Sequence, residues 1–157
     1  SEKEEGSFKK FINNFGVPRS VKEGKTRQLL ESALDWYKKR GPIDVDGFAD
    51  SIKGVLTYGR AVSLSSKIMF LMEPWKILPY DSRAKETLPY KGNEYEVFLK
   101  KAWDYQTKNE TVIRNTLKSI SGMLDILEAP FVGKIEDLKT IRENRFLDKW
   151  LWVGEKT

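Results

Sequence analysis

Apolar residues recur along most of this chain three or four positions apart, which is the spacing of one face of an α-helix. The first such stripe runs from Phe8 to Phe15, and Gly16 then ends it. No segment alternates apolar and polar residues for long enough to predict a sheet. We therefore predict an all-α protein, a single globular domain over residues 1–157 with about seven or eight helices in a non-bundle arrangement, in which residues 1–7 are disordered.

Further helices can be placed from the apolar side chains that should form their buried faces. These side chains are Leu29, Leu30, Ala33, Leu34 and Tyr37 in segment 21–40; Phe48, Ala49, Ile52, Val55 and Leu56 in a helix that opens near Asp44 or Asp46; Tyr95, Phe98, Leu99, Ala102 and Trp103 after a turn at 89–93; and Phe146, Leu147, Trp150 and Leu151 in a last helix from about Glu136. The stripe from Asn109 to Leu127 is the cleanest and is unbroken. It predicts one continuous helix near the centre of the architecture, ended by Pro130.

The stretch from Leu64 to Leu88 is the part of the chain that helix packing alone does not explain. It begins as a short apolar helix that carries Lys67, breaks at Pro74, and continues as an extended segment. Asp81 follows at the point where a second helix opens, and a plain N-cap would account for it. In this arrangement a lysine and a carboxylate could face one another across a turn.

The composition limits the reactions in which a lysine and a carboxylate could take part. The chain contains no cysteine and no histidine, which excludes thiol nucleophiles, disulfides, Ser-His-Asp catalysis, haem ligation and nearly all zinc sites. Asp44, Asp46 and Asp50 resemble half of a calcium loop, but the other ligands are missing, and helix capping by Asp44 or Asp46 is the simpler explanation. We expect no metal and no cofactor, so any active site must use lysine, arginine, carboxylate or hydroxyl side chains.

The charge balance favours a polyanionic partner. The chain has 28 basic and 23 acidic residues, a net charge of +5, and such an excess is compatible with nucleic acid. The clusters Lys38-Lys39-Arg40 and Lys100-Lys101 are expected on solvated helix faces. The functional alternative is that they contact nucleic-acid phosphates. No apolar run approaches the roughly 20 residues that cross a bilayer, and the first residues show no signal-peptide pattern. We expect a cytoplasmic protein that binds DNA and no membrane.

The segment ILPYDSRAKETL (77–88) resembles the extended piece and helix start that carry the catalytic aspartate in the helix-hairpin-helix superfamily of DNA glycosylases. In bifunctional members of that family a lysine on the preceding helix is the nucleophile, and Lys67 in SSKIMFLM matches its place. Lys67 and Asp81 are 14 positions apart (81 − 67), about one helical turn fewer than in the family pattern. AVSLSS stands where the family has a Gly-rich hairpin.

The resemblance implies a glycosylase-like fold and a base-excision activity on an N-glycosidic bond in DNA. Asp81 would stabilise positive charge on the deoxyribose C1′, and Lys67 would attack that carbon and form a Schiff base after a flipped base leaves. The amine must be unprotonated to attack, so burial would have to lower its pKa. The nucleic-acid contacts expected around the pair are Tyr58, Arg60, Ser65, Ser66, Trp75, Tyr80 and Arg83, of which Tyr58, Trp75 or Tyr80 would stack on or wedge beside the flipped base.

A second hypothesis from a different class is a non-catalytic helical module that binds nucleic acid or a protein partner. In that case the central stretch is only a tight helix junction. The distance and the space between the Lys67 amine and the Asp81 carboxylate separate the two hypotheses. A distance of about 5 to 8 Å across an open cleft favours chemistry, and a buried contact favours architecture.

Overall fold

The computed structural model describes residues 2–15, 20–39, 41 and 43–154, and this part of the chain is largely helical and contains no strand. The α-helices are α1 (Glu2–Asn14), α2 (Thr26–Lys38), α3 (Val45–Ser51), α4 (Val62–Met72), α5 (Ser82–Thr87), α6 (Tyr95–Lys108), α7 (Glu110–Ser119), α8 (Ser121–Glu128) and α9 (Leu138–Val153), and a 3-10 helix, η2, follows α3 at Lys53–Val55. An isolated antiparallel bridge joins Val21 to Leu56. The all-α fold is therefore confirmed, with nine α-helices in the described residues rather than seven or eight.

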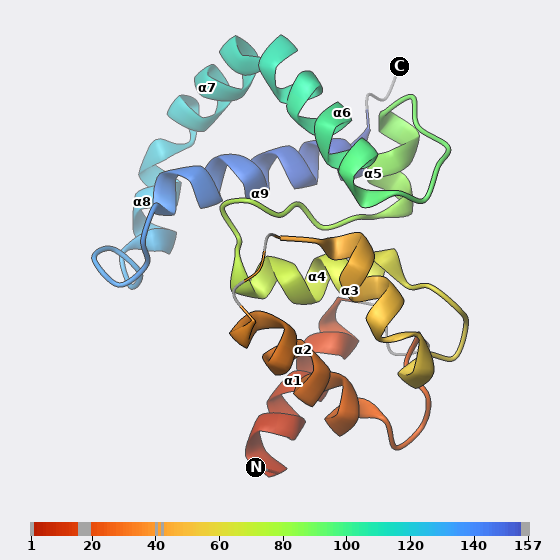
Figure 1. The fold of residues 1–157 in the computed structure, drawn as a ribbon. Helices are drawn as coiled ribbons and strands as arrows, with labels where there is room; N and C mark the ends of the chain where they lie inside the picture. The colour runs from red at the N-terminus through yellow and green to blue at the C-terminus, as the bar shows by residue number, and fades with distance from the viewer. Residues whose placement is uncertain (1, 16–19, 40, 42, 155–157) are drawn as a thin grey trace.

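The helices form two groups, joined by the extended segment that follows α4 (Figure 1). In this view α1 to α4 lie together in the lower part, whereas α6, α7 and α8 arch over α9 in the upper part. The extended segment passes between α4 and α9 before it reaches α5. Within the groups, α3 packs closely on α4 and α5 packs closely on α9. The stretch singled out in the sequence therefore lies at the junction of the two groups.

The centre of the fold is α4, which is buried on nearly all sides. Its buried residues are Val62, Leu64, Ser65, Ser66, Lys67, Ile68, Met69 and Phe70. A helix that is apolar over most of its surface belongs in a core, and here two serines and a lysine are buried with the apolar side chains. The central place expected for the helix over 109–127 therefore belongs to α4.

The prediction of one continuous helix over 109–127 is wrong, because the chain breaks at Ile120 between α7 and α8. Ile120 has φ −106° and ψ 10°, outside regular helix geometry. Next to it, the Ser119 hydroxyl donates to the Thr116 carbonyl at 2.7 Å and so competes with the backbone ladder. Gly122 lowers the helix propensity just after the break. The apolar spacing continues through Ile120, so the break between α7 and α8 could not be predicted from the periodicity.

Several side chains expected in the core lie at the surface. In α2, Leu34 and Tyr37 are 44% and 54% exposed, so among the described residues the end of the predicted stripe is left largely uncovered. Among the residues of α7 and α8, only Ile113 and Leu117 are buried. Residues 2–7 were expected to be disordered, but they form the start of α1. Three glutamates in this first turn suit the positive end of the helix dipole.

The helix expected near Asp44 keeps its full predicted face, since all five of its apolar residues are buried in α3, η2 and their flanks. Asp44 is the N-cap of α3, and its carboxylate accepts the backbone N–H of Gly47 at 2.7 Å. A Cβ atom at position 47 would lie only 2.1 Å from this carboxylate. The capping interpretation of Asp44 is confirmed, and glycine at position 47 leaves room for the cap.

Asp46 ties α3 to α6, so we expect Asp46→Ala to be clearly destabilising. Its carboxylate pairs with the Arg60 guanidinium and accepts the backbone N–H of Tyr95 at 2.8 Å. The substitution leaves both partly buried donors without this acceptor, and we expect urea denaturation to show a loss of about 2–3 kcal/mol. Asp35→Ala, which removes only an exposed ion pair on α2, should cost less than about 0.5 kcal/mol. Equal effects of the two substitutions would contradict the tie.

Candidate functional site

Lys67 and Asp81 come together where α4, the extended segment and α5 meet. The Lys67 Nζ lies 3.9 Å from the Asp81 Oδ2. The Tyr80 N–H donates to the Ser66 hydroxyl at 2.8 Å, which fixes the extended segment on α4. The Asp81 carboxylate accepts the Arg83 N–H at 2.9 Å, so the predicted N-cap of α5 is confirmed. The two residues predicted to face one another across a turn are therefore in contact. Their separation is below the range of about 5 to 8 Å expected across an open cleft, and the Lys67 side chain is buried, so by this criterion the geometry favours architecture.

The Lys67 amine is held inside the protein. Its side chain is only 8% exposed, compared with 26% for Asp81, and its Nζ also donates to the Phe15 carbonyl at the end of α1, at 3.2 Å. Burial lowers the pKa of the Lys67 amine, and the negative charges of Asp81 and Asp148 oppose this effect in part. Lys67 therefore holds its proton less tightly than a solvated lysine does.

Asp148 on α9 is a third charged group of this centre, and the sequence analysis missed it. Its side chain is 7% exposed, lies 2.9 Å from Arg145 Nη1, and lies 3.7 Å from Lys149 Nζ. Burial raises the pKa of the Asp148 carboxyl, Arg145 and Lys149 oppose the rise, and the negative charge of Asp81 adds to it. The centre thus contains one buried amine and two carboxyl groups that act on it.

The signal for this part of α9 was present in the spacing of its residues. Asn144, Leu147, Asp148 and Leu151 fall at i, i+3, i+4 and i+7, and all four are buried. Two polar side chains on a buried stripe indicate internal partners. Asn144 has them, since its Nδ2 donates to the Trp75 carbonyl at 3.0 Å and to the preceding carbonyl at 3.2 Å. Through these bonds α9 holds the extended segment that leads to Asp81.

Three of the predicted nucleic-acid contacts lie inside the protein. Ser65 and Ser66 are fully buried, and the Ser65 hydroxyl has no hydrogen-bond partner among the residues that the structure describes. Tyr80 is 7% exposed, with its hydroxyl donating to the Gly92 carbonyl at 3.0 Å and its ring edge-on to Phe98 at 5.0 Å between centroids. In this structure these three side chains contribute to packing rather than to a surface that nucleic acid could reach.

The other four predicted contacts lie in different surroundings. Tyr58 is 77% exposed in the turn before α4, and Trp75 is half-buried in the extended segment. The Arg60 guanidinium is occupied by the carboxylates of α3, with its Nε 3.1 Å from Asp50 Oδ1. Arg83 lines a cavity with residues of α5, α6 and α9.

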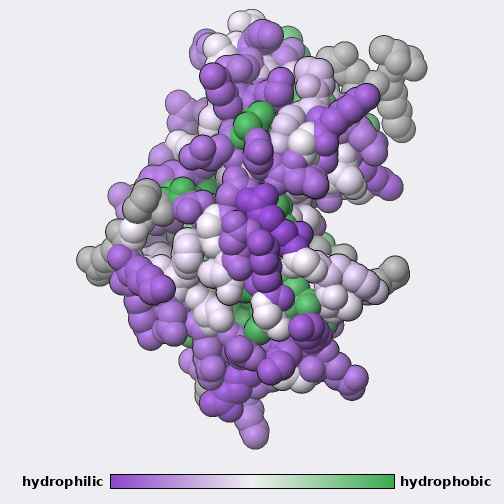
Figure 2. Space-filling view, turned by 45° about the vertical axis from the view of Figure 1, so that its right-hand side comes forward, coloured by the Kyte–Doolittle hydropathy of each residue, from purple (hydrophilic) through white to green (hydrophobic). Residues whose placement is uncertain are grey.

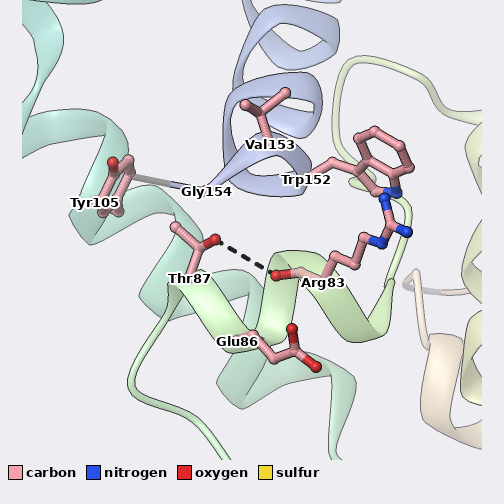
Figure 3. A pocket seen from close by; sticks show the side chains of 7 residues that line it. All are labelled: Arg83, Glu86, Thr87, Tyr105, Trp152, Val153 and Gly154. Atoms are coloured by element: carbon pink, nitrogen blue, oxygen red, sulfur yellow. Dashed lines mark hydrogen bonds between the residues drawn. The ribbon is translucent and has the colours of Figure 1, made fainter. Parts of the chain in front are cut away.

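This cavity has a volume of about 600 Å³ and is lined by Arg83, Glu86, Thr87, Tyr105, Trp152, Val153 and Gly154. Figure 3 shows Arg83 reaching from α5 to the indole of Trp152, with Tyr105 on the opposite side from α6. The guanidinium carbon lies 4.3 Å from the indole centroid. The Arg83 backbone N–H donates to the Asp81 carboxylate, but none of Lys67, Asp81 and Asp148 lines the cavity. An arginine beside an exposed aromatic ring is a combination that binds phosphates and bases.

Other classes of site find little support in the part of the chain that the structure describes. It contains no group of three or more acidic side chains able to hold a metal ion. None of its helices combines the length and the apolar character that crossing a bilayer requires. One face of the molecule is covered largely by hydrophilic side chains, with small apolar areas between them (Figure 2). Comparison with protein-family models, with curated proteins and with solved structures gave no match to this chain.

Proposed function

We propose that this protein acts on DNA and cleaves an N-glycosidic bond, with Lys67 as nucleophile and Asp81 as its partner. The observation that carries the proposal is that Lys67 and Asp81, 14 positions apart in the sequence, come together at 3.9 Å. The contact is shorter and more buried than the open arrangement expected of a catalytic pair, so catalysis requires the Lys67 amine to become accessible. The lowered pKa of that amine supports the proposal, as does the resemblance of segment 77–88 to the helix-hairpin-helix glycosylases. A lysine that holds its proton weakly is a nucleophile, and a carboxylate favours positive charge on a sugar.

In the proposed reaction the unprotonated Lys67 amine donates its lone pair to C1′ of a deoxyribose. The bond from C1′ to the base breaks, and its electron pair leaves with the base, which takes up a proton. The attacking nitrogen gives a proton to Asp81 or to water. The C1′–O4′ bond then opens, O4′ takes a proton and becomes a hydroxyl, and a Schiff base remains between C1′ and Nζ.

A substrate would approach the centre from the side of Asp81, because the Asp81 side chain is more exposed than that of Lys67. The Lys67 amine must first give up its hydrogen bond to the Phe15 carbonyl. Arg83 would then meet a phosphate and Trp152 a base, since both line the same cavity. The proposal therefore includes a small movement of the end of α1 away from Lys67.

Borohydride trapping tests the proposal, because borohydride reduces a Schiff base to a stable secondary amine. The full chain is incubated with duplex DNA that contains abasic or damaged-base sites, and the product is separated by denaturing electrophoresis. We expect a covalent protein–DNA adduct that peptide mapping locates at Lys67. An absent adduct, or an adduct located at another lysine such as the exposed Lys76, would rule out the proposed nucleophile.

A second function is favoured by the burial of Lys67 and by its short contact with Asp81. A contact between a buried lysine and a partly buried aspartate can also be purely structural, and the protein would then be a non-catalytic helical module that binds nucleic acid or a protein partner. Under this alternative no adduct forms, and Lys67 contributes to stability instead. Trapping and unfolding experiments on the same variants therefore separate the two functions.

A further inference from the structure

The cavity lined by Arg83 and Trp152 has the size of a small-molecule site. Its volume of about 600 Å³ falls within the roughly 300–1,000 Å³ that such sites enclose. Three helices, α5, α6 and the end of α9, supply its lining (Figure 3). Neither Lys67 nor Asp81 belongs to this lining. The cavity is therefore a second place, distinct from the Lys67–Asp81 centre, at which a ligand can bind.

Arg83 differs from the other arginines that the structure describes. Each of the others forms an ion pair with a carboxylate, in the pairs Arg27–Glu31, Arg60–Asp46, Arg114–Glu110, Arg142–Glu128 and Arg145–Asp148. Among the described residues no carboxylate lies within ion-pair distance of the Arg83 guanidinium, although Glu86 lines the same cavity. The guanidinium lies over the Trp152 indole instead, 4.3 Å from its centroid. Arg83 is therefore available to bind an anion, and its planar guanidinium suits a phosphate.

Trp152 gives the cavity an aromatic surface, because its side chain is 42% exposed at the end of α9. Lys149 also approaches this ring, with its Nζ 5.8 Å from the centroid, but this amine lies 3.7 Å from the Asp148 carboxylate. Arg83 is therefore the cation of this group that has no opposing charge. An exposed ring binds a base by stacking, and a cation beside it binds the phosphate. A nucleotide, which joins a flat base to a phosphate, matches both features of the cavity.

We propose that this cavity binds an unpaired nucleotide of single-stranded DNA, and that this nucleotide is not the one on which Lys67 acts. The inference rests on the proposed function for the kind of nucleic acid. Because Lys67 and Asp81 do not line the cavity, a base that stacks on Trp152 is not the base whose bond is cleaved. In a continuous duplex every base other than a flipped one stays stacked and paired, out of reach of an indole. The preferred substrate is therefore single-stranded or gapped DNA.

Fluorescence anisotropy of the full chain with a labelled oligothymidylate of about ten nucleotides, within the site sizes of single-strand binders, tests the inference. We expect the wild type to bind this oligonucleotide about 10-fold or more tightly than the matching duplex, and Trp152→Ala to lose about 10-fold in affinity, as for one stacked base. Phe131→Ala is the matched control and should bind as the wild type does. Its ring is exposed to a similar degree, 47% against 42%, but does not line the cavity.

Salt dependence tests the role of Arg83. Arg83→Ala should weaken binding and reduce the slope of log affinity against log salt concentration by about 1, the value for one lost phosphate contact. Arg114→Ala, which removes an arginine of α7 with a 70% exposed side chain, should leave the slope unchanged. Glu86→Gln should strengthen binding about 2-fold or more, because it removes a negative charge from the cavity that receives the phosphate.

Equal affinities for single strand and duplex would overturn the inference, as would Arg83→Ala and Trp152→Ala variants that bind like the wild type. Free thymidine monophosphate that binds as tightly as the oligonucleotide would also overturn it, since the ligand would then be a free nucleotide rather than a DNA strand. The DNA is undamaged and no borohydride is added. A missing adduct with an intact single-strand preference therefore refutes the Lys67 chemistry alone, and an adduct at Lys67 without that preference refutes this inference alone.

Discussion

Lys67→Met is expected to abolish Schiff-base trapping and to leave the protein at least as stable as the wild type. The Lys67 side chain is buried in the core around α4. Methionine fills the space of the lysine's aliphatic stem with a flexible apolar side chain, but it has no amine. Without the nucleophile, the yield of the trapped adduct should fall about 100-fold or more. Measuring the adduct and the unfolding free energy on the same preparation distinguishes loss of chemistry from loss of fold.

The expected stability follows from the pKa of the Lys67 amine. Burial lowers this pKa below its ordinary value of 10.5, so the unfolded chain binds the proton more tightly than the folded chain does. The wild type therefore carries a penalty that is fully present below the folded pKa and disappears as the pH rises toward 10.5. Methionine removes the penalty, and Asp81 stays partly solvated and keeps its bond to the Arg83 N–H.

The structural alternative predicts the opposite result for stability. If the ion pair holds the junction together, removing the amine leaves Asp81 without its partner and should cost about 3–5 kcal/mol. Lys76→Met is the matched control, because Lys76 lies in the same stretch and its side chain is 59% exposed. A Lys67→Met protein that still forms the full amount of adduct would exclude Lys67 as the nucleophile. This conclusion holds whether or not the substitution changes the unfolding free energy.

Phe98→Ala is expected to lower the unfolding free energy by about 3–5 kcal/mol, the range for removing a buried phenylalanine ring. The Phe98 side chain has no exposed surface. Its ring packs against Tyr80 at 5.0 Å and against Tyr95 at 6.0 Å between centroids. Because Tyr80 directly precedes Asp81, the cavity left by the substitution opens beneath the segment that carries the acid. Adduct formation should therefore also fall in this variant.

Urea denaturation of Phe98→Ala and of its neighbour Val97→Ala provides the comparison. Val97 is on the same helix but is 38% exposed, so its truncation should change stability by no more than about 0.5 kcal/mol. A loss below about 1 kcal/mol for Phe98→Ala would mean that α6 is not packed on the extended segment as the structure shows.

Features that depend on a few neighbouring residues could be predicted from the sequence. The buried face of α3, the caps at Asp44 and Asp81, and the break at Pro74 all act over one or two helical turns, and each is present in the structure. The approach of Lys67 to Asp81 was expected for a similar reason, since a short helix, a turn and a second helix start bring both to one junction.

Features that depend on distant parts of the chain could not be predicted in this way. Whether Leu34 is buried depends on which helices pack on α2. The spacing of apolar residues along α2 does not say which helices those are. The hydrogen bond from Lys67 to the Phe15 carbonyl joins residues 52 positions apart. The apolar residues of α9 alone do not reveal the role of Asp148. The signal in the sequence is a carboxylate on a stripe of otherwise buried positions, which indicates a charged partner inside the protein.

The most direct test of the central claim is an NMR titration of the Lys67 amine in protein labelled with ¹³C-lysine, with Lys67→Met identifying its Cε resonance. We predict that the pKa of the Lys67 amine lies clearly below its ordinary value of 10.5. We also predict that Asp81→Asn lowers its pKa further, because the Asp81 carboxylate favours the protonated amine. A Lys67 amine whose pKa is at its ordinary value of 10.5, or does not respond to Asp81→Asn, would contradict the proposed centre.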